Sequence, residues 1–199
     1  MHPNAITQFK QTIEIFGALA PATWSQIEPH LNLHSLKKGE TLLRFDEIPS
    51  AIYFIVEGIF RSYFLDEQGK TYTKNLFFQN ELMGSMPALI RHRPTTLEIE
   101  ALTDATLIAL PFDLLKELMG SDPTLQSIYI AYLEEHWVVE QEEIERSLVM
   151  EDAMIRYLKL LEKEPDLGRL IPSYHIANHL GITPTQLSRI RKKLKSQPM

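Results

Sequence analysis

The sequence predicts an α+β protein built from an N-terminal β-rich unit with flanking helices, one long central helix and a C-terminal helical unit. Two observations establish the first two parts. Residues 32–110 form short runs rich in Ile, Leu, Tyr, Phe and Thr between turn-forming residues, and residues 124–149 contain neither Gly nor Pro. A third observation, the helix-turn-helix layout of residues 172–194, predicts the C-terminal helical unit. The predicted domains are therefore 1–123, 124–149 and 150–199.

Charge is distributed unevenly along the chain. The net charge is −6, but residues 1–149 carry 11 Lys and Arg against 21 Asp and Glu, whereas residues 150–199 carry 9 against 5. Such an asymmetry indicates a basic binding region at the C-terminal end. No run approaches the roughly 18 apolar residues of a membrane span, and the N-terminus lacks the pattern of a secretory leader. We therefore expect a cytoplasmic protein with no membrane partner.

The N-terminal part should contain two short helices followed by strands. Apolar residues recur at helical intervals and Pro21 starts a second short pattern; the residues concerned are Phe9, Ile13, Phe16, Leu19, Trp24, Ile27 and Leu31. Within the β-rich unit, the strand-like runs 51–65 and 71–78 are joined by a charged turn that contains Gly69. This arrangement predicts a β-hairpin made of the two runs.

The predicted central helix carries an apolar stripe that must be covered. Its members are Leu125, Ile128, Tyr129, Tyr132, Leu133, Trp137, Ile144 and Leu148. Either the chain's own β-rich unit or a second copy of the chain can cover them. The helix is long for a small domain, which favours self-association. The predicted dimer contacts are Ile128, Tyr132, Trp137 and Ile144.

Residues 173–180 predict the supporting helix of the helix-turn-helix. Ile176 and Leu180 point inward in this arrangement, and the small Ala177 lets a second helix approach closely. Gly181 then supplies a left-handed turn.

A second helix should start at residue 183. Thr183 is the predicted N-cap, Pro184 takes the first helical position, and Gln186 completes a capping box. Three further residues at steps of three and four share the inward face, namely Leu187, Ile190 and Leu194. The opposite face is polar and basic.

Such a helix fits the major groove of DNA. Arg189 suits a guanine edge, Gln186 suits adenine, and basic side chains neutralise phosphates. The predicted DNA-binding residues are Ser173, Thr185, Gln186, Ser188, Arg189, Lys192 and Lys193. An ordinary amphipathic helix with a solvated basic face is the alternative, but cap, turn, inward face and charge coincide here. In a dimer, two such helices contact half-sites about 34–36 Å apart.

Three segments together resemble the Crp/Fnr family of bacterial transcription regulators: Lys37-Lys38-Gly39-Glu40-Thr41-Leu42, Ile52-Tyr53-Phe54-Ile55-Val56-Glu57-Gly58 and Leu187-Ser188-Arg189-Ile190-Arg191-Lys192-Lys193-Leu194. The resemblance covers nearly the whole chain. It implies an N-terminal β-roll, which is a double-stranded β-helix jelly roll, and a winged-helix-like C-terminal domain. It also implies a homodimer that binds a palindromic operator in double-stranded DNA, a small-molecule effector in the β-roll, and RNA polymerase as a further partner.

The family's effector site pairs an acid with a ribose hydroxyl and an Arg with a cyclic phosphate. The resemblance places this site at Glu81, Leu82, Arg93, Thr95 and Thr96. Glu81 matches the acid, but Thr95 stands where the Arg belongs, and Arg93 lies two residues early. A phosphate there lacks its bidentate partner, which favours another small ligand or none over a cyclic nucleotide. The cofactor therefore stays unknown.

Other kinds of site find little support in the sequence. The chain has no cysteine, which excludes an iron–sulfur cluster and leaves haem ligation by histidine open. His175 and His179 have the spacing of a metalloprotease pair, but Ile176 stands where that motif needs Glu. We expect these histidines on the surface or at phosphates, and no metal site.

The sequence contains neither a glycine-rich phosphate-binding motif nor a Gly-x-Ser-x-Gly nucleophile motif, so we do not expect the protein to be an enzyme. The alternative function is a ligand-binding module whose helix-turn-helix binds another protein.

Overall fold

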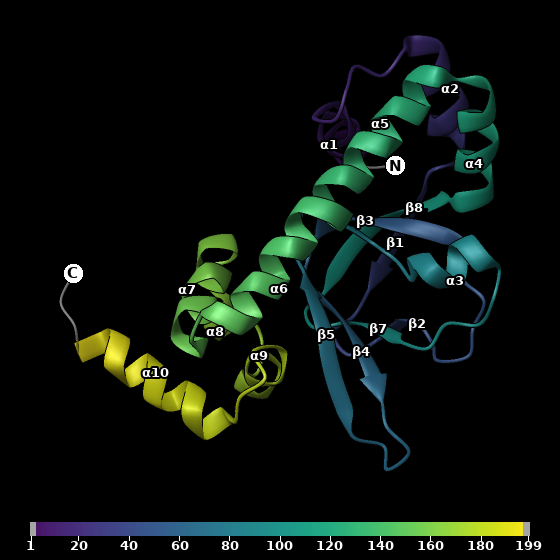
Figure 1. Cartoon of the computed structure of the whole chain (residues 1–199). Helices are drawn as coiled ribbons and strands as arrows, with labels where there is room; N and C mark the ends of the chain where they lie inside the picture. The colour runs from purple at the N-terminus through teal and green to yellow at the C-terminus, as the bar shows by residue number, and fades with distance from the viewer. Residues whose placement is uncertain (1–2, 197–199) are drawn as a thin grey trace.

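The computed structural model describes residues 3–196. Two helices, α1 (Pro3–Glu14) and α2 (Pro21–Ile27), precede the strands, and a 3-10 turn (Glu28–His30) leads into them. The strands are β1 (Asn32–Leu36), β2 (Thr41–Leu43), β3 (Ala51–Glu57), β4 (Phe60–Leu65), β5 (Thr71–Phe77), β6 (Leu82–Met83), β7 (Glu98–Ala101) and β8 (Ala105–Pro111). A short helix, α3 (Met86–Arg91), lies between β6 and β7. The arrangement is shown in Figure 1.

The strands form two four-stranded antiparallel sheets. One has the order β1-β8-β3-β6 and the other the order β2-β7-β4-β5. Between them lies an apolar core in which Ile55, Phe60, Ile99 and Leu107 are fully buried. Two sheets closed around one core form the β-roll that the resemblance implies.

The predicted hairpin has different strands from those expected. Residues 51–65 form two strands, not one, because the chain turns at Gly58 from the first sheet into the second. Gly58 has φ +107°, and an added Cβ would lie 2.6 Å from the Cβ of Ala105. Only glycine fits a backbone that is both left-handed and this close to its neighbour. The hairpin is therefore β4–β5.

Helices cover the outer face of the first sheet. α1, α2, α4 (Phe112–Ser121) and α5 (Pro123–Leu133) bury a second apolar core against β3 and β8. Phe9 of α1 packs its ring against Phe54 of β3, with the centroids 5.3 Å apart. The N-terminal helices are therefore part of the core that covers the first sheet of the β-roll.

The long central helix is present and is continuous through three segments. α5 is followed by a π-helical segment, η2 (Glu134–Val139), and then by α6 (Glu140–Met150). Asp122 caps its start by accepting hydrogen bonds from the backbone N–H groups of Thr124 at 2.8 Å and Leu125 at 3.2 Å. α5 packs on the β-roll, whereas α6 runs on toward the C-terminal helices (Figure 1).

Four helices complete the chain: α7 (Ala153–Lys163), α8 (Leu167–Leu170), α9 (Ser173–His179) and α10 (Pro184–Ser196). Figure 1 shows them grouped beside the lower part of the β-roll, next to β5. Within residues 3–196 no strand follows β8, so the winged detail of the predicted domain is not confirmed. In that same range, every helix is too short or too polar to cross a lipid bilayer.

Candidate nucleic-acid interface

α10 begins where the sequence predicts. The side-chain oxygen of Gln186 accepts a hydrogen bond from the Thr183 backbone N–H at 2.8 Å, and the Thr183 hydroxyl accepts one from the Gln186 N–H at 3.2 Å. This reciprocal pair is a capping box. Gly181 has φ +68°, as the predicted turn requires. The cap already uses the Gln186 carbonyl, so a bidentate contact of this amide with adenine requires the cap to open.

The inward face of α10 is also as predicted. Leu187 is fully buried, and Ile190 and Leu194 are half-buried. They pack in one cluster with Ile176, Ala177 and Leu180 of α9 and with Tyr157, Leu160 and Leu167. The position of α10 is thus set by the helices behind it.

The outer face of α10 is free and carries only positive charge. The exposed residues on it are Thr185, Gln186, Ser188, Arg189, Lys192 and Lys193. Pro184–Ser196 contains no acidic residue. In Figure 1, this helix lies at the far end of the molecule from the N-terminal helices. The structure therefore gathers six of the seven predicted DNA-binding residues on one accessible surface.

Ser173, the seventh, has a different partner. Its hydroxyl accepts a hydrogen bond of 2.7 Å from Nη1 of Arg191, and Nε of Arg191 donates to the Tyr157 hydroxyl at 2.9 Å. Arg191 thereby ties α10 to α9 and α7 and does not point outward with the other cations. An added Cβ at Gly168 would come within 3.1 Å of its guanidinium. The sequence signal for this role was the position of Arg191 next to Ile190, at the margin of the inward face.

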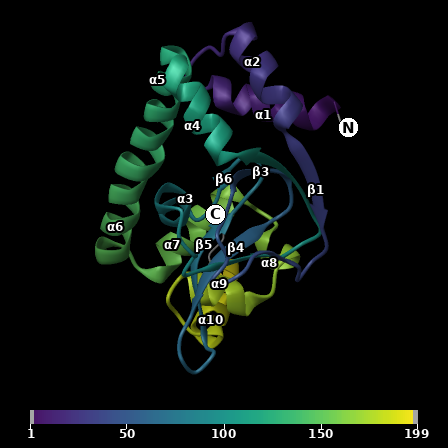
Figure 2. The same cartoon turned by 90° about the vertical axis from the view of Figure 1, so that its right-hand side faces the viewer.

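The face of α9 opposite α10 contacts the β-roll. The Asn178 side chain donates to the Thr71 carbonyl at 2.9 Å and accepts from the Thr73 N–H at 2.8 Å. It pairs in this way with the backbone of β5, an edge strand of the second sheet. Figures 1 and 2 both place α9 beside β5. Asn178 therefore clamps the helix-turn-helix to the β-roll, a role that the sequence did not indicate.

The expectation of surface histidines on α9 is wrong for His175, which is 3% exposed. Burial lowers the pKa of His175 to about 4, and the charges of Arg61 and Lys38 act in the same direction. Burial likewise lowers the pKa of His179 to about 4, with the charge of Lys163 as the next cause. Both rings are neutral at pH 7. The physical reason is that α9 lies between α10 and the β-roll, so His175 faces the β-roll and not water.

Beneath α9, the second sheet carries a buried charge network. Arg61 is 7% exposed and pairs with Glu100 at 2.7 Å. Its guanidinium also lies 4.0 Å from the ring centroid of Tyr63, whose hydroxyl is hydrogen-bonded to Glu98. Burial raises the pKa of the Tyr63 hydroxyl, with Glu98 adding to the effect. The β-roll thus presents a fixed positive group, Arg61, to His175 across the contact.

The residues of the predicted effector site have separate partners. Thr95 is buried, and its hydroxyl lies 2.9 Å from that of Ser85, whereas Arg93 and Thr96 are exposed. Glu81 accepts from the Phe78 N–H at 3.0 Å and from Nζ of Lys163 in α7 at 3.2 Å. Leu82 is half-buried and lines an apolar cavity.

At Thr95, where the resemblance expects a phosphate-binding Arg, the structure has a buried pair of hydroxyls from Thr95 and Ser85. This arrangement offers a cyclic phosphate no charge-assisted partner.

The predicted dimer residues fall into two groups. Ile128 is 4% exposed within the chain's own core, and the ring of Tyr132 packs 5.5 Å from that of Phe16. These two are covered inside the protomer because α5 lies on the N-terminal helices, so Ile128 is not available to a partner. Trp137 and Ile144 are 45% and 49% exposed. The dimer prediction therefore rests on the second half of the central helix.

Comparison with known proteins agrees with this architecture. Residues 33–122 match the family described as "Cyclic nucleotide-binding domain". FixK2 from Bradyrhizobium japonicum superposes with a TM-score of 0.69 at 21% identity, over 84% of this chain and 85% of that one. DNR from Pseudomonas aeruginosa superposes with a TM-score of 0.58 at 19% identity, over 98% of this chain and 87% of that one. A search of curated protein sequences finds no match.

A third neighbour is CLP from Xanthomonas campestris, described as a c-di-GMP responsive global regulator. It superposes with a TM-score of 0.64 at 17% identity, over 89% of this chain and 92% of that one. These structural neighbours are regulators of the Crp/Fnr family. At such identities the likeness establishes the fold that the chain shares with them.

Replacing Asn178 should loosen the contact between α9 and β5. Asn178→Ala removes two hydrogen bonds, each worth about 0.5–1.5 kcal/mol, so local opening becomes easier. We expect the Thr73 amide to exchange its hydrogen roughly 10-fold faster or more. Asn4→Ala, at an exposed position of α1, is the matched control and should leave this amide unchanged. Equal exchange in both variants would show that Asn178 is no clamp.

Acid should weaken the contact between α9 and the β-roll. The unfolded chain takes up protons on histidine near pH 6.5, whereas folded His175 and His179 take them up near pH 4. Their contribution to stability is therefore complete above pH 6.5 and is lost as the pH falls toward 4. We expect the free energy of unfolding, from urea titrations, to fall less over this range in His175→Gln. The control His34→Gln changes an exposed residue and should behave like the parent chain. If the free energy of unfolding falls as steeply with pH in His175→Gln as in the parent chain, His175 is not buried in its neutral form.

Proposed function

We propose that this chain is a homodimeric DNA-binding transcription regulator in which an effector-sensing β-roll controls how two recognition helices meet a palindromic operator. The observation that carries the proposal is the outer face of α10, which is exposed, basic and free of acidic residues on a capped and anchored helix. In this proposal residues 1–123 sense the effector, 124–149 dimerise and 150–199 bind DNA. The winged-helix-like detail and a contact with RNA polymerase remain predictions.

The division of labour on α10 follows from side-chain chemistry. Arg189 is the one guanidinium on its exposed face, and a guanidinium forms two hydrogen bonds with a guanine edge. Lys192 and Lys193 are point charges that suit phosphate oxygens. Gln186 is held in the cap, so we assign Arg189 the main part in base recognition.

Dimerisation is supported by apolar side chains that the protomer leaves uncovered. Trp137, Ile144 and Leu148, in the second half of the central helix, are 45%, 49% and 60% exposed. Apolar residues that follow one another at steps of seven and four have the spacing of helices that pair along one seam. A contiguous stripe of this kind in water marks an association surface.

Contacts between the sensor and the C-terminal helices offer a route for regulation. Glu81 beside β6 pairs with Lys163 of α7 at 3.2 Å. Arg156 of α7 donates to the Glu151 carbonyl at the end of α6 at 2.5 Å and to the Leu180 carbonyl of the turn at 3.1 Å. A shift of β6 or α6 thus reaches the elements that hold α10. DNA as the partner also implies the cytoplasm as the place of action.

Substitutions on α10 should separate base recognition from phosphate binding. Arg189→Ala should reduce the preference for cognate over random duplexes by about 1–3 kcal/mol. Lys193→Ala should weaken all duplexes alike and lower the slope of log K against log salt by about 1 per protomer. Lys116→Ala, exposed on α4, is the control and should change neither quantity.

Gel-shift titrations at several salt concentrations measure both quantities. Equal losses on cognate and random DNA for Arg189→Ala would contradict its role in base recognition. If the affinity did not depend on salt concentration, the result would instead favour a helix-turn-helix that binds another protein.

Charges placed in the apolar stripe should split the dimer. Trp137→Glu with Ile144→Glu puts carboxylates where two helices meet, and burying them there is costly. We expect the mass measured by sedimentation to change from that of two chains to that of one chain, which is 23.0 kDa. Ile15→Glu changes a 77% exposed residue away from the stripe and should leave the dimer intact. A parent chain that is monomeric at micromolar concentration would contradict the proposal outright.

A further inference from the structure

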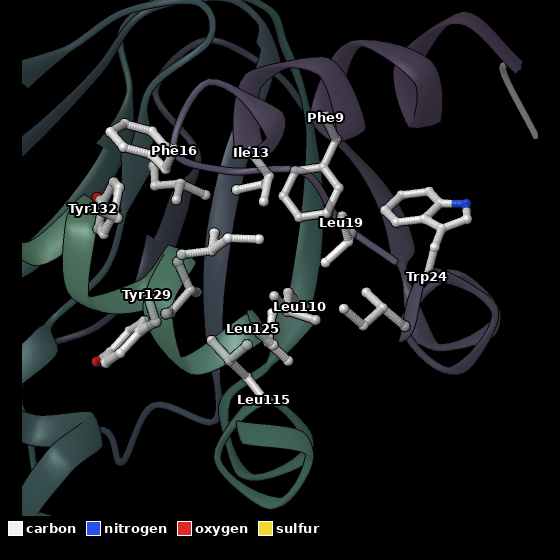
Figure 3. A pocket seen from close by; sticks show the side chains of 14 residues that line it. Phe9, Ile13, Phe16, Leu19, Trp24, Leu110, Leu115, Leu125, Tyr129 and Tyr132 are labelled. Atoms are coloured by element: carbon white, nitrogen blue, oxygen red, sulfur yellow. The ribbon is translucent and has the colours of Figure 1, made fainter. Parts of the chain in front are cut away.

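An apolar cavity lies between the N-terminal helices, the central helix and the first sheet. Its volume is about 50 Å³. Side chains of α1, α2, α4, α5, β3, β6 and β8 line it, as Figure 3 shows. Phe9, Ile13 and Leu19 approach from the N-terminal side, and Leu125 faces them from the central helix. The cavity is thus walled by parts of the chain that are distant in sequence.

The chemistry of the wall is uniform, since no polar atom contributes to it. Two tyrosines belong to the lining, but the hydroxyl oxygens of Tyr129 and Tyr132 point away from the centre in Figure 3. A buried water needs two to four polar partners, so this cavity stays dry. A nucleotide phosphate or any other charged group would lose its hydration there without compensation.

The half-buried side chains at the edge allow access. Ile13, Phe16 and Trp24 line the cavity and remain partly exposed, so a small molecule can reach it from the N-terminal helices. A dry cavity about three times larger binds benzene or xenon in another protein. The volume here suits an atom of xenon, a very small hydrocarbon or the end of an alkyl chain.

The cavity is joined to both surfaces on which the proposed function depends. Ile128 and Tyr132 line it from the central helix, whose later residues form the apolar stripe. Leu82 lines it from β6 and directly follows Glu81, which pairs with Lys163 of α7. An occupant therefore touches the dimer helix and the strand next to the interdomain ion pair. The predicted phosphate position at Thr95 offers no comparable opening, because Ser85 and Leu97 already bond to its hydroxyl.

We propose that this cavity is the effector site and that its ligand is a small, uncharged, apolar molecule. A ligand in the cavity would supply the van der Waals contacts that the wall atoms lack, and would thereby hold the N-terminal helices against the central helix. The regulatory part of the inference rests on the proposed DNA-binding function. The binding part does not, and is tested without DNA.

Xenon is the direct probe of the site. Methyl resonances of Leu82, Leu125 and Ile128 should shift with xenon pressure and saturate, whereas those of Leu43 and Ile55 in the β-roll core should not move. Cyclic AMP should shift none of the cavity methyls. Uniform shifts in both cores, or none in the cavity, would overturn the site.

Filling variants separate a real site from general solubility of xenon in the core. Ile13→Phe adds carbon at the half-buried edge and should weaken xenon binding at least 5-fold. The matched change Ile15→Phe, on a residue that is 77% exposed, should leave binding unchanged. Leu82→Phe fills the cavity from the sheet side and serves where Ile13→Phe does not fold. Unchanged binding in a folded filling variant would overturn the site.

The same variants test regulation, because a permanent filling mimics the ligand. Ile13→Phe or Leu82→Phe should change the affinity for a selected operator at least 3-fold relative to Ile15→Phe. Equal affinities would overturn the effector role while leaving the site intact. Absence of DNA binding by the parent chain would overturn the regulatory part through failure of the proposed function, and xenon binding would still stand or fall separately.

Discussion

The placement of α10 depends on α9, a seven-residue helix that is covered on both sides. One side carries Ile176 and Ala177 against α10, and both are fully buried. The other side carries Asn178, which bonds to the backbone of β5. A helix this short has little stability of its own, so tertiary packing must hold it. Whatever moves the second sheet relative to α9 therefore also moves the basic face of α10.

The central helix serves two surfaces in sequence. Its first half contributes Leu125 and Ile128 to the core between the N-terminal helices and the first sheet, and its second half leaves Trp137 and Ile144 exposed. The change of role falls at the π-helical segment, where His136 contacts Glu140 at 2.8 Å and its ring packs 4.5 Å from that of Tyr132. Such segments recur at functional sites because they realign the faces of a helix. The cavity lies on the side of the first half, so a ligand there acts on the helix that carries the proposed dimer surface.

Local signals predicted the parts of the structure that are governed by local physics. The Thr183–Gln186 cap and the inward position of Leu187 follow from spacing within a few residues, and both are present. The Asn178 clamp joins residues 105 and 107 positions apart, and nothing near Asn178 in the sequence indicates it. Burial of His175 escaped prediction for the same reason. Ile128 was assigned to the wrong surface because periodicity shows that a helix face is apolar without showing what covers it.

The proposed function requires two copies of α10 to bind successive major grooves of one duplex. This requirement can be tested by selecting binding sites for the purified chain from random duplexes and footprinting the selected sites. We expect an inverted repeat whose half-sites have centres about 10–10.5 base pairs apart, protected on one side of the duplex. Enrichment of a single unrepeated site, or no enrichment at low salt, would contradict it.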